Sequence, residues 1–222
     1  IEAEGFDIIE RDTRKTAVLS IERDIAGAPL AELRFKYNNR SIPSYSKTNV
    51  IVELEENGEQ YCFYKTSRDR KWEESISIYL TELGLHLSSS GYYKLNENND
   101  WYKFIEWIKK HKTNLKNHKI DILQDKLPAK FYTGRWRLEY SQETTVDWFQ
   151  LHATIVLDDG RNIPLQALWQ NIISGKREYR LPDGSLFIIP DEWFARYSAI
   201  MLFGERQENQ VVLQKNQYTI LD

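Results

Sequence analysis

Two short stretches hold residue types that bind nucleotide and magnesium, and they decide whether this chain could hydrolyse a nucleotide. Gly175-Lys176 matches the end of a phosphate-binding loop, but Gln170 and Arg177 stand where that loop needs a glycine and a hydroxyl residue. Asp191-Glu192 follow an apolar segment, as do magnesium-binding acids in nucleotide-hydrolysing motors. Because Pro190 precedes them and no phosphate loop is present, we interpret these acids as first-turn residues that complement a helix dipole.

Side chains that bind metals or act as nucleophiles are few and widely spaced. The four histidines share no metal-ligand spacing with one another or with the single cysteine, Cys62. Cys62 lies in a strand-like segment, where a packed thiol is the simpler interpretation, and no Gly-x-Ser-x-Gly elbow occurs. The sequence therefore predicts no catalytic residue, no cofactor-binding residue and no metal ligand, so we do not expect this fragment to be an enzyme.

A strongly basic run covers residues 109–119, with five lysines, two histidines and no acid. Lysines at this density could contact nucleic-acid phosphates, with each ion pair releasing counterions. The run lacks the interleaved aromatic and arginine residues that stack on bases, so the alternative is a solvated helix end with cations near its C terminus. The candidate contacts are Lys109, Lys110, Lys112, Lys116 and Lys119.

Charge and composition narrow the class of protein. The 30 Lys and Arg residues against 33 Asp and Glu give a net charge of −3, which provides no global field to hold polyanions. A hydrophobic content of 41% over 222 residues is enough for a sizeable core and excludes a disordered chain. No long apolar run or leader is visible, and one cysteine suits a reducing compartment, so we expect no membrane partner and a cytoplasmic location.

The two ends of the chain favour a piece of a longer protein, since it opens at Ile1 without an initiator methionine and stops at Asp222 just after a strand-like segment. Residues 1–26 are highly charged and run into a loop signal, which predicts an N-terminal arm. We expect an α+β module over residues 27–130 and a second module over residues 131–222. The composition barely shifts between the two, so they could also form one domain.

In the first module, strict alternation over Leu30–Tyr37 predicts a half-buried strand. Asn57-Gly58 separates two apolar runs and predicts a two-residue hairpin turn, with Leu54 opposite Tyr61. The same register places Val52 opposite Phe63. Helical spacing predicts helices over about 69–83 and from residue 99 or 100 onward, and short strands are expected at 91–95 and 119–123.

In the second module, the order strand, turn, strand, helix occurs twice. Residues 149–157 alternate into the turn at Asp159-Gly160, return through 162–164 and lead into a helix that ends at Gly175. The same order recurs from residue 178 to 204, and its Asp183-Gly184 turn follows the first by 24 residues. Two similar ββα units are therefore predicted. Together with the first module they indicate an α+β fold of antiparallel hairpins with helices packed on them.

Three stretches carry a resemblance. The first is residues 64–85, with Arg68-Asp69 and Glu73-Glu74; the second is residues 147–151; the third, and strongest, runs from Tyr179 to Tyr197. Together, over about residues 30–205, they resemble the region that precedes the motor in bacterial helicase-like ATPases of the Swi/Snf type. The motif residues, which we interpret as structural, are Trp148, Asp183, Gly184, Pro190, Trp193 and Arg196.

In that family the ATP-binding lobes lie C-terminal to this region. The resemblance therefore implies a non-catalytic accessory or regulatory module of a DNA-translocating ATPase, whose motor would need ATP and magnesium and is absent from this fragment. Its partners would be the motor domain of the same chain and, weakly, duplex DNA. The alternative is a stand-alone protein-interaction or small-ligand binding domain unrelated to DNA. A phosphate loop soon after Asp222 would separate the two.

Overall fold

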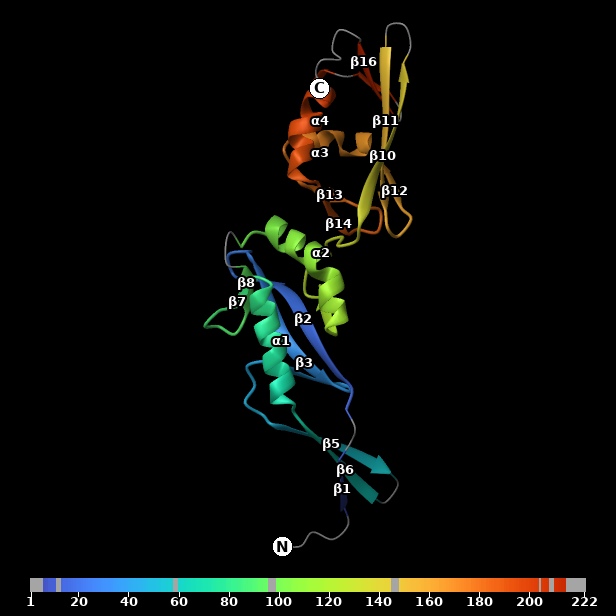
Figure 1. The fold of residues 1–222 in the computed structure, drawn as a ribbon. Coiled ribbons are helices and arrows are strands. Elements are labelled where there is room, and N and C mark those ends of the chain that lie inside the picture. The colour runs from blue at the N-terminus through green and yellow to red at the C-terminus, as the bar shows by residue number, and fades with distance from the viewer. Residues whose placement is uncertain are drawn as a thin grey trace. The chain divides into compact units, whose positions relative to one another are not determined.

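The computed structural model describes residues 6–10, 13–57, 60–95, 99–144, 148–203, 205–207 and 210–214 (Figure 1). The chain divides into two compact units, Ile1–Pro128 and Ala129–Asp222. Both combine helices with antiparallel strands, so the α+β class predicted from the sequence is confirmed. Among the described residues, no helix combines the length and the apolar character needed to cross a membrane.

The first unit is built on a six-stranded sheet in the order β7-β8-β3-β2-β9, with β4 also paired to β3. At its centre β2 and β3 run antiparallel, with Leu19 opposite Leu33, and both of these side chains are fully buried. The strands of this sheet are β2 (Lys15–Arg23), β3 (Pro29–Tyr37), β4 (Arg40–Pro43), β7 (Leu85–Leu87), β8 (Tyr93–Leu95) and β9 (Ile120–Leu123).

The prediction of an N-terminal arm over residues 1–26 is wrong for residues 15–23, which form the central strand β2. Charged residues lie at both ends of this segment and led to the prediction of an arm. Between them, Ala17, Leu19 and Ile21 alternate along the strand and are fully buried in the sheet. The Asp24–Pro29 loop signal therefore marks the turn between β2 and β3, two strands of one sheet.

Two helices lie against this sheet, α1 (Arg70–Glu82) and α2 (Trp101–Asn117) (Figure 1). Each begins after an aspartate that caps it: Asp69 accepts a hydrogen bond from the Trp72 amide, and Asp100 accepts one from the Lys103 amide. The Trp72 ring of α1 meets Phe35 of β3 edge to face, with centroids 5.4 Å apart. Both helices lie where their apolar spacing predicted them.

The first unit also contains a three-stranded sheet in the order β1-β6-β5, formed by β1 (Phe6–Glu10), β5 (Val50–Asn57) and β6 (Gln60–Ser67). The hairpin of β5 and β6 is confirmed, but its predicted register is wrong by two residues: Leu54 lies opposite Phe63, and Asn57 pairs with Gln60. The predicted Asn57-Gly58 turn includes residue 58, which lies outside the described residues. Since the shift is two residues, each side chain stays on the predicted face.

The second unit contains both predicted ββα units. In the first, β11 (Trp148–Leu157) pairs with β12 (Asn162–Pro164) before the short helices η1 (Leu165–Leu168) and α3 (Trp169–Ile173). In the second, β13 (Glu178–Arg180) pairs with β14 (Leu186–Ile188) before α4 (Asp191–Phe203). The remaining strands, which complete the sheet of β11, are β10 (Trp136–Thr144), β15 (Glu205–Gln207) and β16 (Gln210–Gln214).

Candidate functional site

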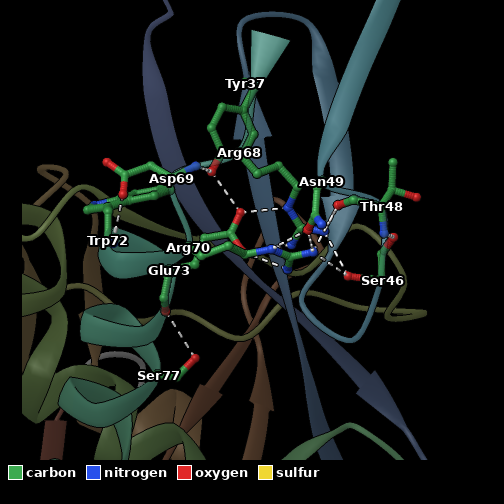
Figure 2. A network of polar contacts seen from close by, with 10 residues as sticks. All are labelled: Tyr37, Ser46, Thr48, Asn49, Arg68, Asp69, Arg70, Trp72, Glu73 and Ser77. Atoms are coloured by element: carbon green, nitrogen blue, oxygen red, sulfur yellow. Dashed lines mark hydrogen bonds and ion pairs between the residues drawn. The ribbon is translucent and has the colours of Figure 1, made fainter.

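The first stretch of the resemblance forms a buried ion pair where β6 leads into α1 (Figure 2). The Arg68 Nε and Nη2 atoms donate to the two carboxylate oxygens of Glu73 over 2.7 and 2.8 Å. The side chain of Arg68 is 0% exposed and that of Glu73 is 5% exposed. A bidentate ion pair of this kind offsets the desolvation free energy of the two buried charges.

Further hydrogen bonds tie the pair to its surroundings. Arg68 Nη1 donates to the backbone carbonyls of Ser46 and Thr48, and the Tyr37 hydroxyl donates to Glu73 Oε1 over 2.7 Å. Burial, together with the bond to Glu73, raises the pKa of Tyr37. The network joins β3, the segment before β5 and the start of α1. We interpret it as structural, because its polar groups are engaged with one another.

Asp69, between the paired residues in sequence, has a separate role. Its carboxylate caps α1 and also binds Lys15 Nζ of β2 over 2.7 Å. The bond from Lys15 lowers the pKa of Asp69 below its ordinary value. Asp69 therefore links the start of α1 to the central strand of the large sheet.

The third stretch of the resemblance begins with the turn between β13 and β14. Gly184 has a φ of 83°, the left-handed region that favours glycine. One carboxylate oxygen of Asp183 accepts hydrogen bonds from the Ser185 amide over 3.0 Å and from its hydroxyl over 2.6 Å. These bonds lower the pKa of Asp183, and they give both motif residues a role in shaping the turn.

Arg161 connects the two Asp-Gly turns of the second unit. Its guanidinium lies 2.5 Å from Asp159 Oδ2 in the first turn and 2.8 Å from Asp183 Oδ2 in the second. The bond from Arg161 lowers the pKa of Asp159. Thus the two turns, which are 24 residues apart in the sequence, share one cation.

A second polar cluster, which was not predicted from the sequence, lies beside the first of these turns. The Tyr132 hydroxyl contacts the Asp158 carboxylate and donates to the Arg135 carbonyl, and burial raises its pKa. A Cβ atom on Gly134 would overlap both the Tyr132 hydroxyl and the Asp158 carboxylate. A side chain at position 134 would therefore displace these two hydrogen-bonded groups. No local pattern indicates this, because Tyr132 and Asp158 are more than 20 residues apart.

The other motif residues contribute to packing and to the start of α4. Trp193 is 4% exposed, and its ring meets Trp136 edge to face at 4.9 Å. Pro190 stands immediately before α4, while Arg196 is exposed and lies over the Tyr197 ring. Trp148 lies at the start of β11, and its side chain is outside the described part of the structure.

The acids at 191 and 192, weighed in the sequence as magnesium ligands, occupy the exposed first turn of α4. The Arg177 Nε atom lies 3.0 Å from an oxygen of Asp191. Over the ranges for which the structure gives coordinates, no three His, Cys, Asp or Glu side chains are grouped so that they could hold a metal ion. Cys62 is half-buried on β6.

The structure separates the basic run of residues 109–119 into two groups. On α2, Lys109, Lys112 and Lys116 follow one another at helical spacing along one stripe, whereas Lys110 lies on the other side of the exposed face. Lys119 follows the helix with a φ of 56°. Lys109 is half-buried and the other four are exposed, so the predicted lysines form a narrow stripe with flanking charges.

Comparison with known proteins adds no relative to this description. No protein-family model matches the chain, and it matches neither a curated protein nor a solved structure.

Proposed function

We propose that this chain is a non-catalytic accessory or regulatory module of a Swi/Snf-type DNA-dependent ATPase. The observation that supports the proposal is that the residues of the strongest stretch of the resemblance have structural roles in the second unit. Asp183 and Gly184 shape one turn, and Trp193 packs in the core of the same unit. A motif made of turn and core residues specifies a scaffold, so the shared residues favour a shared fold for this region.

The role of the polar motif residues also favours a module without its own chemistry. Arg68 is held by Glu73, and Asp183 is held by Ser185 and Arg161. Such groups stabilise the fold and are not directed at a bound molecule. In this proposal the chemistry belongs to the motor, which would bind ATP and magnesium, and the module acts through contacts with that motor.

The lysine stripe on α2 supports a secondary contact with duplex DNA. Lys109, Lys112 and Lys116 lie along one line of the helix, where they could follow neighbouring phosphates. The chain has a net charge of −3, so this contact would be weak and easily screened by salt. The motor therefore remains the main partner in this proposal.

Reading the coding sequence beyond the codon for Asp222 tests the proposal directly. We expect a Gly-x-x-x-x-Gly-Lys-Ser/Thr loop there, followed by the remaining ATPase motifs. In the full-length protein encoded by that reading frame, DNA-stimulated ATP hydrolysis should change when this module is deleted. A reading frame without motor motifs would overturn the proposal and favour a stand-alone binding domain.

A further inference from the structure

The three-stranded sheet of the first unit presents apolar side chains to solvent. Val50, Val52 and Leu54 alternate along one face of β5 and are 37%, 57% and 55% exposed. In Figure 1 neither α1 nor α2 lies over these strands. A small sheet is usually stable only when an apolar face is covered, and a row of exposed apolar residues is typical of an interaction site.

The outer side of β5 is also open to pairing. β6 lies between β1 and β5, and within the described ranges no strand pairs with the opposite side of β5. An edge strand offers backbone N–H and C=O groups that can bind an extended peptide. β5 spans eight residues and contains neither proline nor lysine, the residues that commonly block such pairing. This edge therefore suits an added strand better than a helix.

The net charge of the three-stranded sheet indicates what charge an added strand should carry. Its three strands carry five acidic side chains and one basic side chain, Lys65. On β5, Glu53 lies on the face opposite Val52 and Leu54, because side chains alternate along a strand. Arg40 of β4 already places its Nε atom 2.9 Å from Glu53 Oε1. A neighbouring strand would be complementary if it alternated apolar and basic residues.

We propose that the outer edge of β5 binds a basic, strand-forming polypeptide segment that adds to the β1-β6-β5 sheet as a fourth strand. Its apolar residues would pack beside Val50, Val52 and Leu54, and its lysines or arginines would lie on the face of Glu53. A second copy of this chain suits the edge less well, since pairing two β5 strands would bring like charges together. The inference is independent of the motor assignment and concerns a different surface from the lysines of α2.

Fluorescence anisotropy with the full chain and labelled peptides tests this inference. The probe is a short peptide that alternates valine and lysine, and its matched control carries glutamate in place of every lysine. We expect the lysine peptide to bind, with an affinity that falls as salt is raised, and the glutamate peptide not to bind. Hydrogen exchange should then show slower exchange in β5 and unchanged exchange in β7. Equal binding of both peptides would overturn the inference.

Two variants locate the site. Val52→Lys should weaken binding by about tenfold or more, because it places a charge like that of the peptide at the centre of the apolar row. Leu87→Lys, at a site that is 55% exposed on β7, is the matched control and should bind as the wild type does. A double variant, Glu53→Gln with Glu55→Gln, should bind more weakly and with a smaller salt dependence.

Two outcomes would contradict the assignment of this edge. One is unchanged binding by Val52→Lys and by the double variant, which would place the peptide elsewhere. The other is a wild-type dimer in sedimentation that Val52→Lys converts to a monomer, which would assign the edge to a second copy. Thermal melts of each variant confirm that it is folded before its binding is compared.

Discussion

At the scale of single residues, Gly184 should be sensitive because its backbone conformation disfavours a β-branched side chain. A Cβ atom at this position would have no atom within 4 Å, so a substitution there tests backbone strain and not crowding. With φ at 83°, Gly184→Val should lower the free energy of unfolding by about 1 kcal/mol or more. Thermal or urea unfolding measures the loss. Gly184→Asn is the control and should lose less, because asparagine tolerates this region; equal losses would contradict the strain argument.

Trp193 tests packing at the same scale. The ring is almost fully buried and meets both Trp136 and Tyr197 edge to face. Trp193→Ala should therefore cost about 3–5 kcal/mol of stability through lost contacts and the cavity left behind. Arg196→Ala, on the exposed face of the same helix, should cost less than about 1 kcal/mol. A Trp193→Ala protein of full stability in urea unfolding would show that the core does not depend on this ring.

At the scale of elements, Arg161 joins the two Asp-Gly turns, and this link should respond to acid. The pKa values of Asp159 and Asp183 are lowered in the folded chain, so their stabilisation is present above the ordinary aspartate pKa of about 3.9. It is lost as the pH falls through the lowered folded values. Arg161→Met should be less stable than the wild type at neutral pH, and the difference should shrink below about pH 4.

Thermal melts across this pH range check the prediction. The control is Arg137→Met, which removes an exposed ion pair with Glu139 that should contribute little at any pH. A stability difference between Arg161→Met and the wild type that stays constant down to strongly acidic pH would show that Arg161 stabilises the turns by packing alone. Arg161 also lies over the Tyr132 ring. The pH dependence of the stability difference therefore separates the contribution of the ion pairs from that of packing on Tyr132.

The stripe on α2 is the element that should decide DNA binding. At about 0.15 M salt, where screening reaches about 8 Å, we expect duplex binding to be weak or undetectable by fluorescence anisotropy. Any binding at low salt should disappear, with its salt dependence, when the five lysines of residues 109–119 are replaced by glutamine. The control replaces five exposed lysines elsewhere: Lys36, Lys47, Lys71, Lys130 and Lys176. Tight binding that resists salt and survives the first replacement would refute this prediction.

At the scale of the whole molecule, the two units should fold independently. The core of the second unit is drawn from residues 132–197 and includes Ile155, Phe187 and Trp193. The first unit has its own buried set around Leu19, Leu33 and Phe104. Chains cut between residues 128 and 129 should therefore each melt cooperatively, which circular dichroism measures. A piece without a cooperative transition would show that its core needs the other unit.

Much of the fold could be predicted from the sequence because the signals are local. The alternation of β3 and the helical spacing of α1 and α2, with the Asp69 and Asp100 caps, each depend on residues within a few positions of one another. The same holds for both ββα units, whose turns carry Asp-Gly pairs. Such patterns reflect backbone geometry, which a segment keeps wherever it packs.

Tertiary structure alone decided the remainder. The charged ends of β2 gave no sign in the sequence of a central strand, which is defined by its pairing with β3 and β9. The register of the β5-β6 hairpin differs by two residues from the one that the Asn-Gly pair favoured. The buried pair of Arg68 and Glu73 and the bridge through Arg161 also lay beyond the sequence. Arg68 and Glu73 are only five residues apart, but their burial depends on the Tyr37 hydroxyl and on two carbonyls of the segment before β5. Arg161 likewise reaches an aspartate 22 residues further along the chain. Burial and charge compensation choose among such pairings only once the chain has folded.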